Sequence, residues 1–196
     1  MLKLSRSFSW KPNILRVERV YKGNWLNFEK VHYLSQEGKE SEWEFCSRPF
    51  KYLDFDNVKV LATTKEPTKL LVIAIYRWHL ENYILEFPAG LIEQNQTAQT
   101  NTAKELQEET GYQVKSENVQ LGEISCNDPW KSNEKNQLTL VEINYKTQQC
   151  LEPDEKIQVF LLPTEDLLNQ LTKLADSNNW GIDSRLYYFA KGLSLS

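Results

Sequence analysis

Residues 90–112 have the sequence GLIEQNQTAQTNTAKELQEETGY, and this stretch decides the fold. From Thr97 to Thr110 it contains neither glycine nor proline, and Gly111 follows. Threonine is a frequent N-cap residue, and glycine is frequent just after a helix because it adopts a left-handed conformation without strain. The stretch therefore predicts a helix that begins near Thr97 and ends before Gly111.

Three glutamates lie close together on this predicted helix. Glu105 and Glu109 are four residues apart and Glu108 lies three residues after Glu105, so all three project from one narrow face. Like charges at this spacing repel each other, and a bound cation would offset the repulsion. Carboxylate oxygens suit Mg²⁺ or Mn²⁺. Taken alone, the pattern also fits an ordinary solvent-exposed helix face.

The residues before the helix favour the metal site. With them, the segment resembles the Nudix box, whose pattern is Gly, five residues, Glu, seven residues, and then Arg-Glu-apolar-x-Glu-Glu-x-Gly-apolar. Gly90 opens this pattern, and later residues match it in register: Glu105, Leu106, Glu108, Glu109, Gly111 and Tyr112. Two positions depart from it, because Gln96 replaces the first glutamate and Lys104 replaces the arginine.

The resemblance extends over roughly Val17 to Leu193 and is closest to the ADP-ribose and ADP-sugar pyrophosphatase branch, in which LEFPAGLIE (residues 85–93) is typical. It implies an α+β fold, the Nudix α/β/α sandwich with a mixed β-sheet and an N-terminal antiparallel β region. The chain would then comprise a basic N-terminal arm or transit-like segment (1–16), an N-terminal β region that mediates dimerisation (17–57) and a Nudix domain (58–196).

Apolar patterns and turns outside the box agree with an α+β or α/β/α architecture. Strands are expected at 17–33 around a Lys22-Gly23-Asn24 turn, 43–46, 58–62, 70–77, 83–87, 119–124, 138–145 and 157–162. A helix is expected to open at Pro163–Asp166 with acidic residues in its first turn. A last helix is expected to start near Asp183 and to bury Leu186, Phe189 and Leu193.

The resemblance also implies a metal site. Glu105 and Glu109 match the principal metal ligands of the family, and the carbonyl of Ala89 matches a further one. Glu108 matches a catalytic helper, and Glu155, in a later polar loop, matches the glutamate proposed as the base that activates water. Mg²⁺ is the expected cofactor, with Mn²⁺ as the alternative.

The two departures from the box affect residues that hold the loop and the helix together in the family. Gln96 and Lys104 can still form hydrogen bonds, but the bidentate charged pair is lost. We expect Glu93, in the same loop, to replace part of the lost charge. A further departure is Trp130, which follows Pro129 where family members usually have glycine.

Four residues match substrate contacts of the branch. Trp25 and Trp43 match tryptophans that stack on adenine, the second being supplied by the other subunit of a dimer. Arg48 and Arg77 match arginines that contact the diphosphate and the terminal ribose region. Without the box, the tryptophans would be assigned to a hydrophobic core and the arginines to the surface.

Composition excludes several other classes of function. The chain carries 23 Lys and Arg against 27 Asp and Glu, a net charge of −4, which disfavours sequence-independent nucleic-acid binding. Its two histidines and three cysteines cannot form a zinc site of usual spacing, and they favour a reducing compartment over a disulfide framework. No apolar stretch is long enough to span a membrane.

These observations lead to a main hypothesis and a rival. The main hypothesis is Mg²⁺-dependent hydrolysis of ADP-ribose, or a related ADP-sugar, to AMP and ribose 5-phosphate by a homodimer. The rival is a catalytically weakened Nudix-fold subunit with a structural or nucleotide-binding role in a larger assembly, mitochondrial or not, which Gln96, Lys104, Trp130 and the basic segment 1–16 would suit. That segment also resembles a mitochondrial transit peptide, so the expected location is mitochondrial or cytoplasmic.

Overall fold

The computed structural model describes residues 11–195, so the first part of the predicted basic arm, 1–10, lies outside the described residues. The chain divides into two compact units. The N-terminal unit comprises the chain up to Lys51 together with Cys126–Glu134, and the main unit comprises Tyr52–Ser125 and Lys135–Ser196. Within the described residues, no helix is long and apolar enough to cross a membrane.

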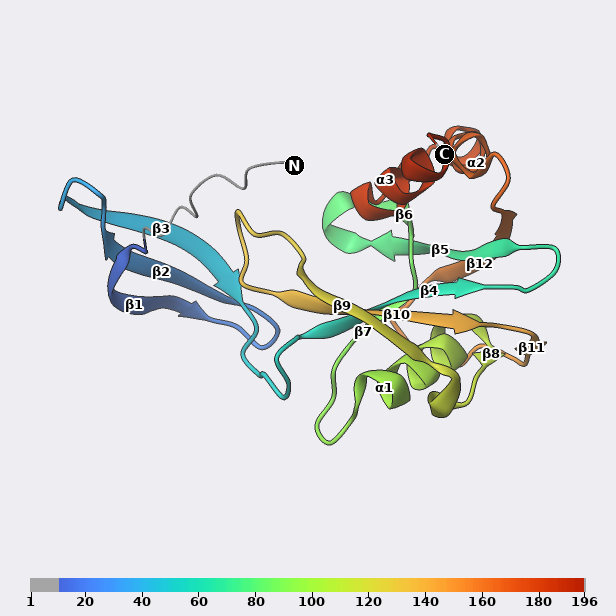
Figure 1. The fold of residues 1–196 in the computed structure, drawn as a ribbon, viewed down its shortest axis with the longest axis horizontal. Coiled ribbons are helices and arrows are strands. Elements are labelled where there is room, and N and C mark those ends of the chain that lie inside the picture. The colour runs from blue at the N-terminus through green and yellow to red at the C-terminus, as the bar shows by residue number, and fades with distance from the viewer. Residues whose placement is uncertain (1–10, 196) are drawn as a thin grey trace, which may run out of the picture. The chain divides into compact units, whose positions relative to one another are not determined.

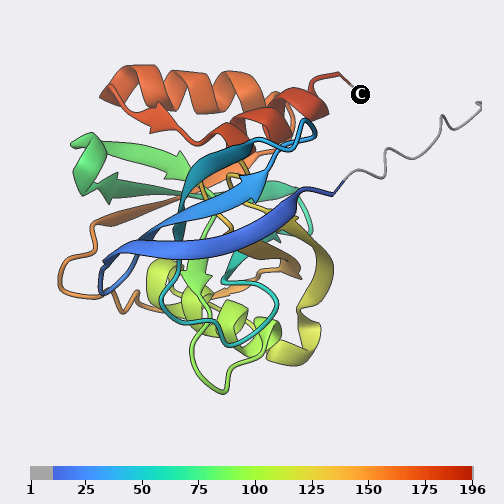
Figure 2. The ribbon, with the colours of Figure 1, turned by 90° about the vertical axis from the view of Figure 1, so that its left-hand side faces the viewer.

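The N-terminal unit is built on an antiparallel sheet of three strands, which confirms the predicted N-terminal β region (Figures 1 and 2). Its strands are β1 (Asn13–Lys22), β2 (Asn27–Leu34) and β3 (Glu40–Ser47), paired in that order. At the expected turn between β1 and β2, the N–H of Gly23 donates to the carbonyl of Leu26 (3.0 Å). Every residue of β1 is exposed.

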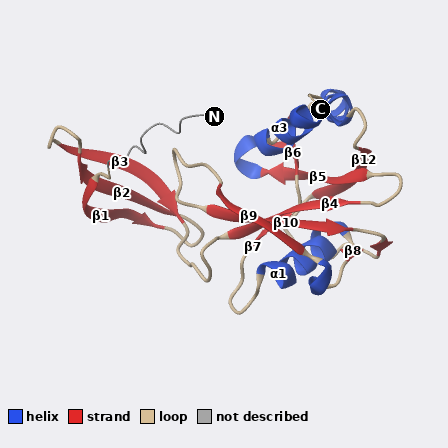
Figure 3. Cartoon of the chain, in the orientation of Figure 1, coloured by secondary structure: helices blue, strands red, loops and turns tan. Residues whose placement is uncertain are grey.

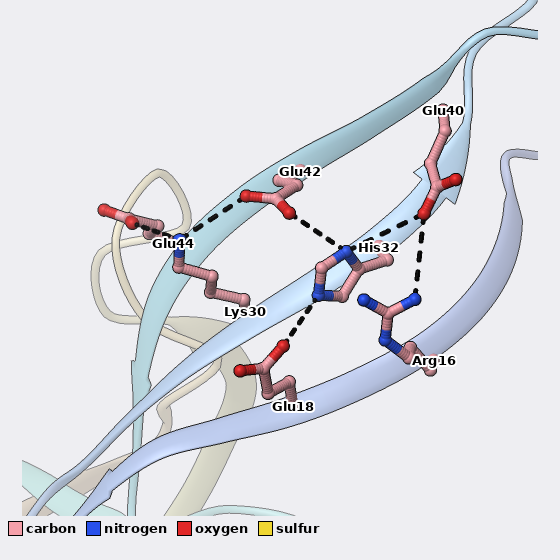
Figure 4. Close-up of polar contacts among 7 residues, drawn as sticks. All are labelled: Arg16, Glu18, Lys30, His32, Glu40, Glu42 and Glu44. Carbon is pink, nitrogen blue, oxygen red and sulfur yellow. Dashed lines mark hydrogen bonds and ion pairs between the residues drawn. The ribbon is translucent and has the colours of Figure 1, made fainter.

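A buried histidine ties these strands together (Figure 4). His32 lies on β2 and is only 3% exposed. Its Nε2 lies 3.2 Å from Oε2 of Glu18 on β1, and its Nδ1 lies 3.2 Å from Oε1 of Glu42 on β3. Lys30 pairs with Glu42 (3.4 Å) and Glu44 (3.2 Å). These polar contacts link all three strands of the sheet.

The main unit contains a mixed sheet, which the described residues build from eight strands (Figure 3). The principal order is β13-β6-β5-β4-β10-β9, with β12 paired to β5 and β7 paired to β4. β4 and β10 are parallel, whereas β5 is antiparallel to β6 and β12. The bounds are β4 (Asn57–Thr63), β5 (Lys69–Arg77), β6 (Asn82–Glu86), β7 (Ala89–Leu91), β9 (Gln120–Cys126), β10 (Lys135–Glu142), β12 (Ile157–Pro163) and β13 (Gly181–Ile182).

Helices cover both faces of the mixed sheet, which confirms the predicted sandwich (Figure 3). On one face, the β4 residues Val58 and Val60 share a core with Leu106, which follows α1 (Ala98–Glu105). On the other face, Leu85 of β6 packs with apolar residues of α2 (Leu167–Asn178) and α3 (Ser184–Leu193). A short pair, β8 (Tyr112–Gln113) with β11 (Tyr145–Lys146), lies beyond the acidic helix.

The predicted acidic helix forms, with a change in its last turn. Thr97 is the N-cap of α1 and makes a capping box, and Gly111 follows the helix with φ of +78°. Leu106–Thr110 (η2) is π-helical rather than α-helical. The wider turn begins directly after Glu105, so Glu109 lies on it. Such turns are frequent at functional sites.

Two details of the predicted C-terminal helices were wrong. α2 begins at Leu167, and its N-cap residue Asp166 has a left-handed backbone (φ +56°), so Glu165 and Asp166 precede the first turn instead of forming it. Leu193 is exposed rather than buried, because α3 ends at this residue. Leu186, one of the residues expected to be buried, is fully buried.

Candidate active site

Gly90 and Glu105 are packed directly against each other. Gly90 lies on β7 opposite Val58 of β4, and Glu105 is the last residue of α1. A β-carbon at position 90 would overlap the carboxyl group of Glu105, so glycine is required for this side chain to lie where it does. The strand and the helix thereby place a carboxylate against the backbone of β7.

Glu109 reaches the same segment from the π-helical turn. It is only 4% exposed, and its Oε2 accepts a hydrogen bond from the backbone N–H of Ala89 (3.1 Å). The structure therefore brings Ala89, Glu105 and Glu109 together. Glu108, on the same turn, is directed to Lys104 instead.

Burial raises the pKa of both carboxyl groups. It raises the pKa of Glu105 to about 7, against the opposing charge of Lys104 and with support from the negative charges of Glu108 and Glu155. It raises the pKa of Glu109 well above its usual range, and the charge of Glu105 adds to the effect. Buried carboxylates that repel each other are stabilised by a bound cation.

These residues fit a hard divalent cation. Two carboxylates and a backbone carbonyl are oxygen donors of the kind that Mg²⁺ accepts, and Mg²⁺ usually retains several waters. Among residues 11–195, no three His, Cys, Asp or Glu side chains are arranged to hold a metal by themselves. The fit therefore depends on the carbonyl of Ala89 together with Glu105 and Glu109, and on water or substrate for the remaining positions.

Lys104, which stands where the box has arginine, pairs with two carboxylates. Its Nζ lies 2.8 Å from Oε1 of Glu93 and 3.1 Å from Oε2 of Glu108. Partial burial lowers the pKa of Lys104, but its hydrogen bonds to Glu93 and Glu108 and the charges of Glu108 and Glu105 together raise it above its usual range. Gln96, which stands where the box has glutamate, makes no side-chain hydrogen bond to the part of the chain that the structure describes.

Glu155 lies in the loop between β11 and β12. Its Oε2 accepts the N–H of Glu152 (3.0 Å), and its own N–H donates to the carbonyl of Glu152 (3.0 Å), so the two residues close a turn. Its negative charge raises the pKa of both Glu105 and Glu109. The loop therefore brings Glu155 into electrostatic reach of the carboxylate pair.

Arg77, at the end of β5, forms a bidentate pair with Glu86, at the end of β6. Nε donates to Oε1 (2.8 Å) and Nη2 donates to Oε2 (2.7 Å). The Glu86 side chain is 8% exposed and that of Arg77 is 37% exposed. Arg77 is therefore held by a buried carboxylate, and part of its guanidinium stays accessible to an anion.

Sequence reasoning missed Lys59. It interrupts the apolar run of β4, and it pairs in register with Ala89. Burial and the charge of Arg185 lower its pKa, whereas the carboxylate of Glu86 raises it. The charge of Lys59 in turn lowers the pKa of Glu109. A lysine within a run of buried strand residues is the signal that could have identified it.

The other predicted substrate residues lie in the N-terminal unit. Trp25 is 72% exposed and Trp43, on β3, is 51% exposed, so neither belongs to a hydrophobic core. Arg48 pairs with Glu134 (Nη2 to Oε1, 2.7 Å), and its Nη1 donates to the carbonyl of Trp25 (3.3 Å). Trp130 is also exposed. Arg48 and Trp25 are thus in contact, through a backbone carbonyl.

Known proteins resemble this chain in sequence and in fold. The NUDIX domain family matches residues 55–182. ADP-sugar pyrophosphatase of Mus musculus is 32% identical over 188 residues, covering 91% of this chain and 84% of that protein. ADP-ribose pyrophosphatase of Saccharomyces cerevisiae is 28% identical, covering 88% and 78%. The crystal structure of an ADP compounds hydrolase superposes with a TM-score of 0.67 at 22% identity, covering 94% and 95%.

Proposed function

The chain belongs to the Nudix family and is a hydrolase, and we propose that it cleaves the diphosphate of ADP-ribose, or of a related ADP-sugar, to AMP and ribose 5-phosphate or the matching sugar phosphate. The observation that carries the proposal is the pair of buried carboxylates, Glu105 and Glu109, held against Gly90 and Ala89. The printed activities of the mouse and yeast relatives support the substrate class.

The proposed cofactor is Mg²⁺, with Mn²⁺ as the alternative. Glu105, Glu109 and the carbonyl of Ala89 would hold it, and Glu108 would assist. When bound, the metal would neutralise the diphosphate and lower the pKa of a water molecule. The two carboxylates would otherwise repel the negatively charged substrate, so their role depends on binding a cation.

Glu155 is the proposed base. It lies within electrostatic reach of Glu105 and Glu109, and it is partly exposed, so it can take up a proton from the attacking water and release it to solvent. Arg77 is proposed to stabilise the negative charge that develops on the phosphoryl oxygens. Because Glu86 holds its guanidinium, little side-chain freedom is lost when the substrate binds.

The N-terminal unit is proposed to supply the adenine site of a homodimer. The exposure of Trp25 and Trp43 supports this role, because an indole must be accessible to stack on a base. Trp43 would act on the site of the second subunit, and Arg48 would contact the diphosphate. We also propose a mitochondrial or cytoplasmic location, which imaging of chains with and without residues 1–16 would test.

The proposal is tested by incubating the purified chain with ADP-ribose and Mg²⁺ and measuring AMP by chromatography. AMP is expected to form, and its formation should stop after chelation of the metal and in Glu109→Gln. Absence of AMP, at a protein concentration at which Gln96→Glu does produce it, would overturn the proposal. That result would favour the rival, a weakened subunit of a larger assembly.

A further inference from the structure

A single lysine joins the loop before α1 to the acidic turn of the helix. Lys104 lies on α1, and its Nζ contacts Oε1 of Glu93 (2.8 Å) and Oε2 of Glu108 (3.1 Å). Glu93 follows β7, the strand that carries Ala89 and Gly90. One ammonium group therefore links the segment that would offer a carbonyl to a metal with the helix that would offer the carboxylates.

A β-turn explains how Glu93 can act in place of a carboxylate at position 96. The N–H of Gln96 donates to the carbonyl of Glu93 (3.2 Å), and Asn95 has φ of +65°. Residues 93–96 thus form a turn whose third residue is left-handed, a conformation that asparagine tolerates well. The first and fourth Cα atoms of a β-turn lie within about 7 Å of each other. Position 96 is therefore close to position 93, so a carboxylate there lies within a side-chain length of the one that Lys104 contacts.

We propose that Glu93 and Lys104 are positioning residues that set the acidic face of the helix for its metal, with Glu93 supplying the carboxylate that position 96 lacks. Lys104 holds Glu108 beside the loop, and its positive charge offsets the mutual repulsion of the glutamates on this face. The two unusual residues of the box, Gln96 and Lys104, are thereby accounted for by one rearranged ion pair.

Exposure indicates where the effect of this ion pair should be found. The side chains of Lys104, Glu93 and Glu108 are 35%, 52% and 33% exposed. Exposed ion pairs contribute little to folding. The pair is therefore expected to act on metal binding and on turnover more than on stability. This inference rests on the proposed metal-dependent hydrolysis, and its test distinguishes a failure of the positioning role from a failure of the proposed function.

The test measures Mn²⁺ binding to the purified full chain by electron paramagnetic resonance, without substrate. Glu93→Gln should weaken binding about threefold to fivefold. The double variant E93Q/Q96E has the natural net charge and moves the carboxylate to the other end of the turn, so it should restore binding. In a Lys104→Met background, Glu93→Gln should have no further effect.

Glu44→Gln is the matched control. Glu44 is an exposed glutamate that shares a lysine, Lys30, with a second glutamate, as Glu93 shares Lys104, but it lies in the N-terminal unit. It should leave Mn²⁺ binding unchanged. Thermal unfolding of every variant should stay close to that of the natural chain, and kcat with ADP-ribose should follow Mn²⁺ binding.

Two results would overturn the inference and leave the proposed function in place. One is equal binding by Glu93→Gln and the natural chain, and the other is a double variant that stays as weak as Glu93→Gln. A natural chain whose Mn²⁺ binding is unchanged by Glu105→Gln and Glu109→Gln would instead overturn the metal site itself, and the positioning role with it.

Discussion

The carboxyl group of Glu105 occupies the space that a β-carbon on Gly90 would need. This contact joins β7 to the end of α1, and it explains why a glycine opens the pattern of residues 90–112. It also makes the placement of Glu105 testable by adding one methyl group.

Gly90→Ala should therefore displace Glu105 or β7 and lower kcat/KM about a hundredfold, because small misplacements of reacting groups have large effects on rate. The free energy of unfolding should change by less than about 1 kcal/mol, because the overlapping atoms are the end of a flexible side chain that can move aside. Gly192→Ala is the control, since nothing lies within 4 Å of a β-carbon there and alanine favours a helix. Urea unfolding measures the free energy of unfolding, and steady-state kinetics measure kcat/KM. A Gly90→Ala variant with the natural kcat/KM would contradict this placement of Glu105.

The pH dependence of stability should reflect the carboxylate pair. The pKa of Glu105 is about 7 in the folded chain against 4.5 for the free group, so between these values the folded chain holds a proton that the unfolded chain has released. Stability of the metal-free chain should therefore fall as pH rises through this range, and the raised pKa of Glu109 acts in the same direction.

Thermal unfolding with a chelator at about pH 5 and about pH 8 would measure this effect. Comparison with the double variant E105Q/E109Q isolates the two groups from all others, because the variant cannot release these protons. Added Mg²⁺ should remove most of the loss at the higher pH, since the metal takes the place of the protons. If the thermal unfolding midpoint of the natural chain changed with pH by the same amount as that of the double variant, the raised pKa values would be contradicted.

Arg77 and Glu86 should depend on each other for stability. Arg77→Met leaves the buried Glu86 carboxylate without its two hydrogen bonds, which should lower the free energy of unfolding by about 1–3 kcal/mol. Arg77→Met should also raise the KM for ADP-ribose, because the guanidinium is absent. The double variant R77M/E86Q should recover part of the lost stability, but its KM should stay as high as that of Arg77→Met. Urea titrations and kinetics separate the two effects, and additive losses in the double variant would show that the pair is not coupled.

How much could be predicted from the sequence depends on how local the determining interactions are. The helix at 98–110, its cap at Thr97 and the strands around it follow from spacing and from turn residues, which act over a few positions. The π-helical turn at 106–110 could not be predicted, because it depends on how the helix packs. The sequence did indicate that Glu93 replaces part of the charge lost at position 96, but its pairing with Lys104 depends on the turn at 93–96, which the sequence did not predict.

The electrostatic effect of Lys59 on Glu109 is apparent only in the structure. A lysine in an apolar strand is unusual, but the sequence does not show that packing places its charge where it lowers the pKa of Glu109. Lys59→Met should raise the free energy of unfolding by up to about 1 kcal/mol, because a desolvated charge is removed. A destabilised variant, measured in urea, would contradict the view that the charge of Lys59 is unfavourable for folding.

Trp43→Ala should weaken ADP-ribose binding by about tenfold, the usual loss when an aromatic platform is removed from a base, and change the free energy of unfolding by less than about 1 kcal/mol. Its 51% exposure is the reason for the small effect on folding, and Trp78→Ala, at a tryptophan 64% exposed in the main unit, is the control. Calorimetry with Mg²⁺ and a non-hydrolysable analogue of ADP-ribose measures binding without turnover.

A mixture of two impaired chains tests whether Trp43 acts across a dimer. If it does, a dimer of one Trp43→Ala chain and one Glu109→Gln chain contains one intact site, because the chain with the natural Glu109 receives Trp43 from its partner. At ADP-ribose concentrations far below KM, where Trp43→Ala chains alone are about tenfold impaired, equal mixing should raise activity to about one quarter of the natural value, since half of the dimers are mixed and each has one good site. If Trp43 acts within its own chain, both sites of the mixed dimer are defective and mixing restores nothing.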